Sequence, residues 1–206
     1  MNQFKKSFYR KIKFDTDISN NKTLLSNKIC EQKILIIGGA GTIGSSYLKQ
    51  ILKFKPSKIT VVDINENGLA ELTRDLRSSD LLDYNPEYIT YPVNLLSDTF
   101  DKIFNSDKWD VVANFSAHKH VRSEKDKISV EALIKNNVFG AIKLLNLCDA
   151  KPPKYFFSVS TDKAANPVNV MGASKSLMES LILSKKKKFR VSTARFANVA
   201  FSNGSL

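Results

Sequence analysis

One stretch of this chain, KILIIGGAGTIG at residues 33–44, restricts its fold more than any other. Residues 33–37 are a short apolar run rich in β-branched side chains, which is typical of a strand buried on both faces. Glycines follow at once, and a helix is predicted over residues 43–54. A helix that begins directly after such a turn presents free N–H groups and the positive end of its dipole, so it suits a phosphate group.

Each of three glycines in this turn has a separate reason to be glycine. Gly38 makes the tight turn out of the strand, Gly41 lets the backbone approach a pyrophosphate, and Gly44 lets the helix pack close to the sheet. Their spacing is one residue wider than the usual dinucleotide pattern. A second apolar strand, residues 58–62, ends in Asp63, about 20 residues beyond the last glycine, where a carboxylate can accept hydrogen bonds from the adenosine ribose.

This order of strand, turn, helix, strand and acid favours a dinucleotide site over a glycine-rich connection in another kind of α/β protein. Because a carboxylate repels a 2′-phosphate, Asp63 favours NAD over NADP. The predicted cofactor contacts of this segment are Gly38, Gly41, Thr42, Ile43, Gly44 and Asp63.

Strand and helix patterns alternate along the rest of the chain. This alternation predicts an α/β fold, a Rossmann-type doubly wound parallel sheet with right-handed crossovers and helices on both faces. Ligands of such sheets bind at the carboxyl ends of the strands, so residues just after each strand are the candidates for the site. The further predicted strands cover residues 88–93, 110–116, 154–160 and 189–195, and the further helices cover residues 67–78, 98–105, 130–148 and 171–183.

Composition limits the alternatives. With 206 residues, 42% hydrophobic and 25% charged, the chain suits one domain or slightly more. It has no apolar run near the ~18 residues of a membrane helix and no apolar core after its basic start. Cys30 and Cys148 lie in no metal-ligand spacing. We therefore expect a cytoplasmic protein without a metal site.

The net charge is +12, and much of it lies in a lysine run at residues 185–188 and in the first 13 residues. Such a charge is compatible with nucleic acid, a membrane surface or an acidic ligand. No nucleic-acid motif is present, so a solvated surface or tail accounts for most of the charge, and no nucleic-acid partner is expected.

Residues 1–32 form a basic, polar N-terminal extension, and residues 33–206 are predicted to form the dinucleotide-binding domain. Phe4, Phe8 and Ile12 are spaced for a short amphipathic helix over residues 2–14. Such a helix allows membrane-surface contact through residues 1–20. Because its apolar face is small, we instead expect an arm packed on a partner subunit, or disorder.

Polar side chains follow the fourth and fifth predicted strands. After the fourth come His118, Lys119 and His120; a lone histidine there is more often structural, but three polar groups beside a nucleotide cleft suit a phosphate or a sugar. After the fifth strand comes Ser160-Thr-Asp-Lys-Ala164, and Lys175 follows near the start of a helix. Lys175 can reach the cofactor ribose and lower the pKa of nearby hydroxyls. The alternative is a loop with ordinary capping residues.

Four segments together make the chain recognisable: STDKAANPVNVMGASK (160–175), HKHV (118–121), NNVFG (136–140) and RFANV (195–199). Over about residues 33–206 the chain resembles the extended short-chain dehydrogenase/reductases. Within them it resembles the CapD-like polysaccharide-biosynthesis family, the UDP-N-acetylglucosamine-type nucleotide-sugar 4,6-dehydratases.

The resemblance implies a cycle on a bound nicotinamide: oxidation of the sugar at C4, elimination of water across C5 and C6, and reduction at C6. Asp162 matches the family acid, Lys163 the adjacent base, and Thr161 the hydroxyl that hydrogen-bonds the C4 oxygen. To act as a base, Lys163 has to lose its proton readily, which burial near the charge of Lys175 would favour.

The resemblance also implies NAD as cofactor and a UDP-sugar substrate, and we expect a homo-oligomer. It adds residues to both halves of the site. The implied cofactor contacts are Asn94, Ser116, Ala117 and Lys175, and the implied substrate contacts are His118, Lys119, His120, Asn137 and Asn198.

Some residues depart from the family pattern. Met171 replaces the superfamily's active-site tyrosine, as it does in related dehydratases, and methionine cannot move a proton. Asn94 stands where relatives usually have an adenine-contacting aspartate, Ile37 replaces a threonine, and Ala197 replaces a glycine.

Family members also continue past residue 206 into a smaller portion that grips the nucleotide-sugar. We therefore expect either a fragment or a shortened homologue that binds dinucleotide but has weak or no dehydratase activity. An epimerase or reductase of the same fold, and a non-catalytic nucleotide-binding protein, are the alternatives.

Overall fold

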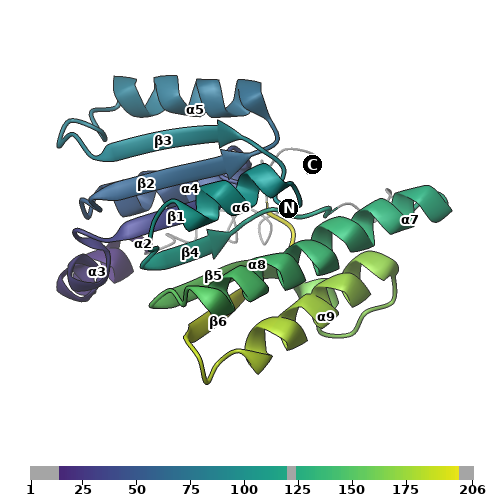
Figure 1. Cartoon of the computed structure of the whole chain (residues 1–206). Helices are drawn as coiled ribbons and strands as arrows, with labels where there is room; N and C mark the ends of the chain where they lie inside the picture. Colours follow the sequence, from purple (N-terminus) through teal and green to yellow (C-terminus); the bar gives the residue numbers. More distant parts are fainter. Residues whose placement is uncertain (1–13, 120–123, 200–206) are drawn as a thin grey trace, which may run out of the picture.

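The computed structural model describes residues 14–119 and 124–199, and they form a parallel sheet between two layers of helices (Figure 1). The six strands are hydrogen-bonded in the order β3-β2-β1-β4-β5-β6, and every pair is parallel. The predicted Rossmann-type fold is confirmed. The strands are β1 (Lys33–Ile37), β2 (Lys58–Asp63), β3 (Glu87–Pro92), β4 (Val111–Asn114), β5 (Tyr155–Thr161) and β6 (Arg190–Phe196).

Two hydrophobic cores lie on opposite faces of the sheet, and β1 contributes to both. Its residues alternate: Ile34 and Ile36 face one core, and Leu35 and Ile37 face the other. Helices α4 (Thr42–Leu52) and α5 (Glu66–Ser78) cover the first face. Helices α6 (Asp98–Asn105), α8 (Gly140–Ala150) and α9 (Val170–Ser184) cover the second.

The strand order reverses beside β1, since β2 pairs with one of its edges and β4 with the other. Chain segments leave β1 and β4 in opposite directions, which opens a crevice at their carboxyl ends. Because every pair of strands is parallel, the amino ends of all six lie at the opposite edge. The arrows of β2 and β3 show this direction in Figure 1.

The predicted helix over residues 130–148 is confirmed as helical, but it is not α-helical throughout. Helix α7 (Lys127–Ile134) runs into a π-helical turn, η2 (Lys135–Phe139), before α8 begins. The buried amide of Asn137 lies in this turn and hydrogen-bonds to the backbone of His118 in the loop after β4. The fourth strand also ends earlier than expected, because the backbone N–H and hydroxyl of Ser116 turn back to the Asn114 side chain.

The N-terminal extension contains two short helices that its polar composition does not predict, α2 (Phe14–Asn20) and α3 (Lys22–Ile29). The predicted amphipathic helix over residues 2–14 lies outside the described residues, apart from Phe14, which begins α2. Among the described residues, no helix has the length and apolar character needed to cross a bilayer. The same residues contain no group of three or more histidine, cysteine, aspartate or glutamate side chains able to hold a metal ion.

Candidate active site

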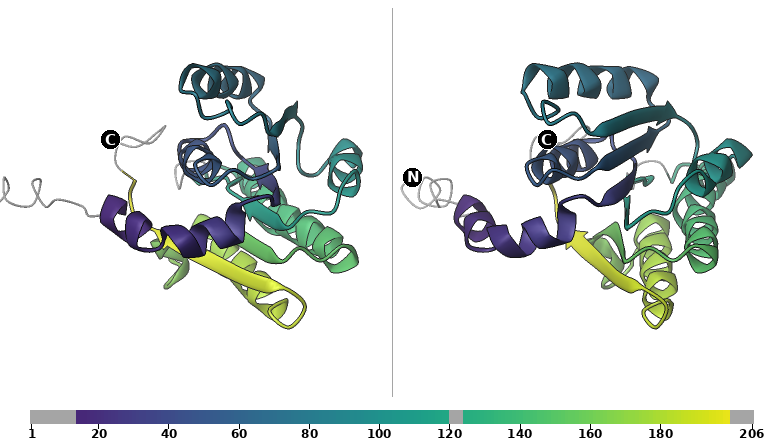
Figure 2. Two further views of the ribbon diagram at one scale, coloured as in Figure 1. Left: turned by 90° about the vertical axis from the view of Figure 1, so that its left-hand side faces the viewer. Right: turned by 60° about the vertical axis from the view of Figure 1, so that its left-hand side comes forward.

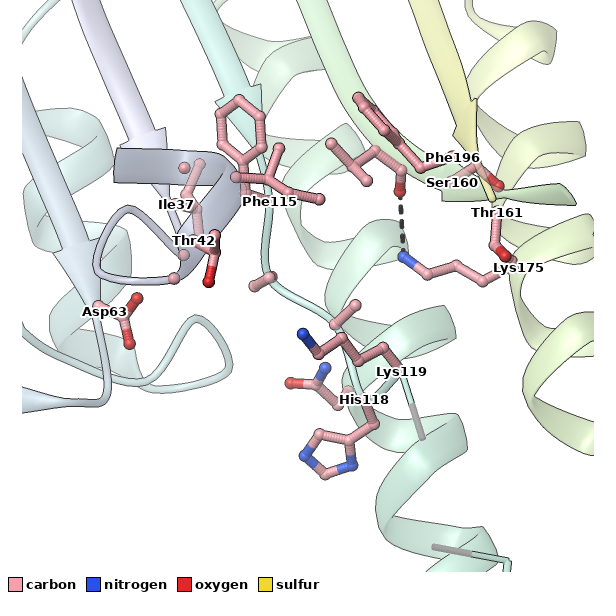
Figure 3. A pocket seen from close by; sticks show the side chains of 18 of the residues that line it. Ile37, Thr42, Asp63, Phe115, His118, Lys119, Ser160, Thr161, Lys175 and Phe196 are labelled. Atoms are coloured by element: carbon pink, nitrogen blue, oxygen red, sulfur yellow. Dashed lines mark hydrogen bonds between the residues drawn. The ribbon is translucent and has the colours of Figure 1, made fainter. Parts of the chain in front are cut away.

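A cavity of about 1110 Å³ lies at the carboxyl edge of the sheet. It extends from the glycine turn after β1 to the segment after β5, and residues after β2, β3, β4 and β6 also line it. Figure 3 shows Thr42 and Asp63 on one side of it and Thr161 and Lys175 on the other. The cavity therefore brings together segments that lie far apart in the sequence.

The glycine turn has the geometry of a phosphate cradle. Gly38 has a φ of +76°, which other residues rarely adopt. A Cβ at Gly44 would lie 2.4 Å from the Gly38 carbonyl oxygen, so the helix can approach the turn only without a side chain there. At Gly41 a Cβ would meet nothing closer than that same oxygen at 3.5 Å, so this position opens into the cavity. Gly41 is also the N-cap of α4, and it has no side chain to cover the first helical N–H groups.

Asp63 ends β2 and lines the cavity beside this turn. One carboxylate oxygen accepts from the backbone N–H of Ala40 at 2.9 Å, and the other accepts from the N–H of Asn65 at 3.0 Å. The carboxylate thus holds the glycine turn in place. Each oxygen retains a second lone pair, which a ribose hydroxyl can use.

Lys175 lies in the opposite wall, on the second turn of α9. It is 4% exposed, and its ammonium donates to the Val159 carbonyl at 3.1 Å and to the Met178 sulfur at 3.6 Å. Burial lowers the pKa of Lys175 to about 8, although the charge of Glu179 one turn further on acts in the opposite direction. Arg195 holds Glu179 through two donors, at 2.9 and 2.6 Å.

Thr161, Asp162 and Lys163 form a local hydrogen-bonded group at the end of β5. The Thr161 hydroxyl donates to the Asp162 carboxylate at 2.8 Å, and this bond, together with the charge of Lys163, lowers the pKa of Asp162. Thr161 and Lys163 line the cavity, whereas Asp162 between them does not, and its side chain is half exposed.

The expected burial of Lys163 beside Lys175 is wrong for this structure. The Lys163 side chain is 39% exposed, and its ammonium lies 3.6 Å from the carboxylate of Asp162. The reason is the short 3-10 turn Asp162–Ala164, which carries Lys163 to the rim of the cavity while Lys175 projects into the wall from α9.

Asn137 lies behind the cavity wall rather than in it. Its side chain accepts from the backbone N–H of His118 at 2.9 Å, donates to the His118 carbonyl at 3.0 Å and donates to the Ser174 hydroxyl at 3.0 Å. Asn137, which was predicted as a substrate contact, thus joins the loop after β4 to helix α9 in this structure. Its neighbour Asn136 lines the cavity instead.

Replacing Asn137 by alanine removes all three of these hydrogen bonds. Because the His118 backbone groups and the Ser174 hydroxyl lose this partner, we expect the free energy of unfolding to fall by about 2–3 kcal/mol. Urea denaturation measures this, and faster proteolysis within residues 115–126 would show that the loop has loosened. Alanine at exposed Asn105 is the matched control. An unchanged denaturation midpoint would contradict the joining role.

The start of helix α9 is fixed by two acceptors. The Asn169 side chain accepts from the N–H of Gly172 at 2.8 Å, and the carboxylate of Glu124 accepts from the N–H groups of Val170 and Met171. Met171 therefore lies in the cavity wall, and only 2% of the residue is exposed. The sequence does not predict that Glu124 caps this helix, because Glu124 lies in a loop 46 positions before Val170 and has no periodic relation to the helix.

Most predicted site residues line the one cavity. They include Asn94, Ser116, Ala117, His118, Lys119 and Asn198, together with the glycine turn. His120 lies outside the described residues. Sequence reasoning missed Ile64, Phe115 and Phe196, although each follows or ends a strand at the carboxyl edge, and that position is the signal that could have found them.

A scan against protein-family models matches residues 34–206 to the family described as "Polysaccharide biosynthesis protein". This chain belongs to that family. Its match spans the six strands, apart from the first residue of β1, and every described residue of the cavity. The resemblance to CapD-like proteins and nucleotide-sugar 4,6-dehydratases is thus confirmed at the level of the family.

The individual relatives are longer than this chain, which aligns with only part of each. An uncharacterized membrane protein of Methanocaldococcus jannaschii, MJ1061, is 37% identical over 188 residues, which are 88% of this chain and 53% of the relative. An inverting UDP-N-acetylglucosamine 4,6-dehydratase of Campylobacter jejuni is 30% identical over 181 residues, 85% of this chain and 51% of the relative. The X-ray structure of Pen from Bacillus thuringiensis superimposes with a TM-score of 0.73 at 29% identity, over 86% of this chain and 53% of that one. The chain therefore spans about half the length of these relatives.

Proposed function

We propose that this chain forms the dinucleotide-binding and catalytic part of a nucleotide-sugar 4,6-dehydratase that uses NAD and acts on a UDP-N-acetylglucosamine-type substrate. The observation that carries the proposal is the single cavity that joins the glycine turn and Asp63 to Thr161, Lys163 and Lys175. The similarity to the dehydratase of Campylobacter jejuni supports the reaction class.

The residues at the glycine turn fit a dinucleotide. The space at Gly41, which a Cβ would fill, accommodates a pyrophosphate against the start of α4. Asp63, with lone pairs left on both oxygens, suits an adenosine ribose without a 2′-phosphate. Lys175 reaches the same cavity from α9 and suits the hydroxyls of the second ribose. When bound, NAD would supply hydride acceptance from the sugar C4 and hydride return to C6.

The other steps fall to residues at the end of β5. Oxidation at C4 acidifies the C5 proton, and we assign its removal to Lys163. Lys163 can act as this base only if bound substrate shields it from water, because its ammonium is now partly exposed beside Asp162. The departing C6 hydroxyl needs a proton, which we assign to Asp162. Asp162 can hold that proton only if bound sugar replaces the Thr161 hydroxyl as its neighbour, because the bond from Thr161 now favours the ionised carboxylate. The freed Thr161 hydroxyl can then donate to the C4 oxygen. Met171 cannot accept the C4 hydroxyl proton, and Lys175, with its pKa lowered to about 8, is our candidate for that exchange.

A single-turnover assay tests the proposal. The chain, in excess over UDP-N-acetylglucosamine and with NAD added, is incubated in deuterated water and the sugar is analysed by mass spectrometry. We expect a product that is lighter by one water molecule and carries deuterium at C5, and we expect Lys163→Ala to abolish it without changing NAD binding.

Other products would identify the alternatives. A C4 epimer of unchanged mass would replace the proposal with an epimerase, and NADH formed without loss of water would replace it with a simple dehydrogenase. Binding of neither NAD nor the UDP-sugar would leave a scaffold of the same fold.

A further inference from the structure

Positive charge gathers at the amino edge of the sheet, opposite the cavity. The loop before β5 carries Lys151 and Lys154, and the loop before β6 carries the lysine run 185–188. Arg190 begins β6, and Lys28 reaches the same edge from helix α3. Figure 2 shows the N-terminal helices from two further sides, and the contact of Lys28 with Tyr155 joins α3 to the start of β5. We call Lys28, Lys151, Lys154, Lys186, Lys187 and Arg190 the amino-edge basic patch; all six are exposed.

Two cations of this patch converge on a neutral group. The Lys28 ammonium donates to the Tyr155 hydroxyl at 2.6 Å, and the Arg190 guanidinium donates to the same oxygen at 3.3 Å. Within the described part of the chain, neither cation forms an ion pair with a carboxylate. Two like charges that share one oxygen repel each other, so an anion placed between them would be stabilised.

Nearby carboxylates neutralise only part of the surrounding charge. Asp149 pairs with both Lys185 and Lys188, and Asp110 pairs with Lys154 at 3.0 Å. Lys151 donates to a backbone carbonyl, that of Asn105. For Lys186 and Lys187 the described residues offer no ion pair, so the tip of the lysine run keeps its full charge.

The neighbouring side chains favour a lipid surface over nucleic acid. Single-stranded nucleic acid needs open aromatic rings for base stacking, but Lys28 and Arg190 already lie over the Tyr155 ring, 5.2 and 5.6 Å from its centre. Leu24, one turn before Lys28 on α3, is 56% exposed. Exposed apolar side chains next to lysines are typical of segments that lie at a membrane interface.

We propose that the amino-edge basic patch docks this protein on a membrane of anionic phospholipids, with the Lys28–Tyr155–Arg190 group receiving a headgroup phosphate. In this orientation the carboxyl edge, with its cavity, faces away from the bilayer and stays open to a nucleotide-sugar from solution. The proposal concerns the folded edge of the sheet and does not depend on residues 1–13.

The test is co-sedimentation of the full chain with vesicles of phosphatidylcholine alone or mixed with phosphatidylglycerol. Each lysine near an anionic surface contributes about fivefold to binding. Reversing two of them, Lys186→Glu with Lys187→Glu, is therefore expected to weaken binding to the mixed vesicles by at least about 25-fold. The matched control, Lys125→Glu with Lys127→Glu, makes the same charge change at the opposite edge and should leave binding unchanged. Lys28→Gln with Arg190→Gln tests the phosphate position separately and should also weaken binding by about 25-fold.

Three results would overturn the proposal. One is equal sedimentation of the unaltered chain with both kinds of vesicle. Another is an equal loss in the control and patch variants, which would indicate a general effect of net charge. The third is a duplex DNA competitor that removes the chain from vesicles at an equal charge concentration, which would assign the patch to nucleic acid. Unchanged melting temperatures of all variants confirm that each remains folded.

Discussion

Replacing Gly44 by alanine is expected to lower the free energy of unfolding by about 3 kcal/mol or more. The added Cβ would lie 2.4 Å from the Gly38 carbonyl oxygen and 2.9 Å from the Gly39 Cα, and both are backbone atoms that cannot turn aside. Helix α4 would have to move away from the turn, which separates the phosphate cradle from the sheet. Urea denaturation measures the stability loss.

Gly41→Ala is the matched variant, because the same methyl group meets only ordinary contact there. We expect it to cost less than about 1 kcal/mol in stability, the usual difference between glycine and alanine at an N-cap. Because the methyl group would occupy the space assigned to the pyrophosphate, we expect NAD binding to weaken by roughly tenfold or more, which is about 1.4 kcal/mol. Equal NAD affinity in Gly41→Ala and the unaltered chain would contradict the assigned position.

Replacing Lys175 by methionine is expected to stabilise the protein while weakening its binding of NAD. A lowered pKa of about 8 means that the folded state disfavours the charged lysine, by an amount of the order of 3 kcal/mol. Methionine has a similar length and no charge to bury, although it leaves the Val159 carbonyl without a donor. Loss of a charged hydrogen bond to ribose should weaken NAD binding by roughly tenfold or more. Thermal denaturation and calorimetric titration measure the two effects.

The sign of the pH dependence follows from the same pKa. Between pH 8 and the ordinary value of 10.5, the unfolded chain keeps the proton of Lys175 while the folded chain has lost it. Since the unfolded state then binds more protons, the free energy of unfolding rises with pH through this window. The advantage of Lys175→Met over the unaltered chain should therefore be largest below pH 8 and shrink toward pH 10.5. A constant difference between the two proteins would mean that Lys175 does not carry the assigned pKa.

The strands and the cradle could be predicted from the sequence because they depend on local patterns. The run at residues 33–37 and the glycines after it follow steric rules that need no distant partner. Because the strands are parallel, placing a residue just after one also places it at the ligand edge. This is why residues as far apart as Gly41 and Lys175 were predicted for one site.

What the sequence could not show depends on contacts between distant segments. The side chain of Asn137, in the π-helical turn, hydrogen-bonds to the His118 backbone, and no periodicity in the sequence predicts that partner. The exposure of Lys163 depends on a three-residue turn whose direction the motif does not encode. The contact between Lys28 and Tyr155, on which Arg190 also converges, joins residues that are 127 positions apart.

A crystal structure of this chain with NAD bound tests the account most directly. We predict that the pyrophosphate lies against the backbone at Gly41 and the start of helix α4, and that the nicotinamide ring lies beside Thr161 and Lys175. A pyrophosphate bound elsewhere, or a nicotinamide ring remote from the end of strand β5, would contradict the account.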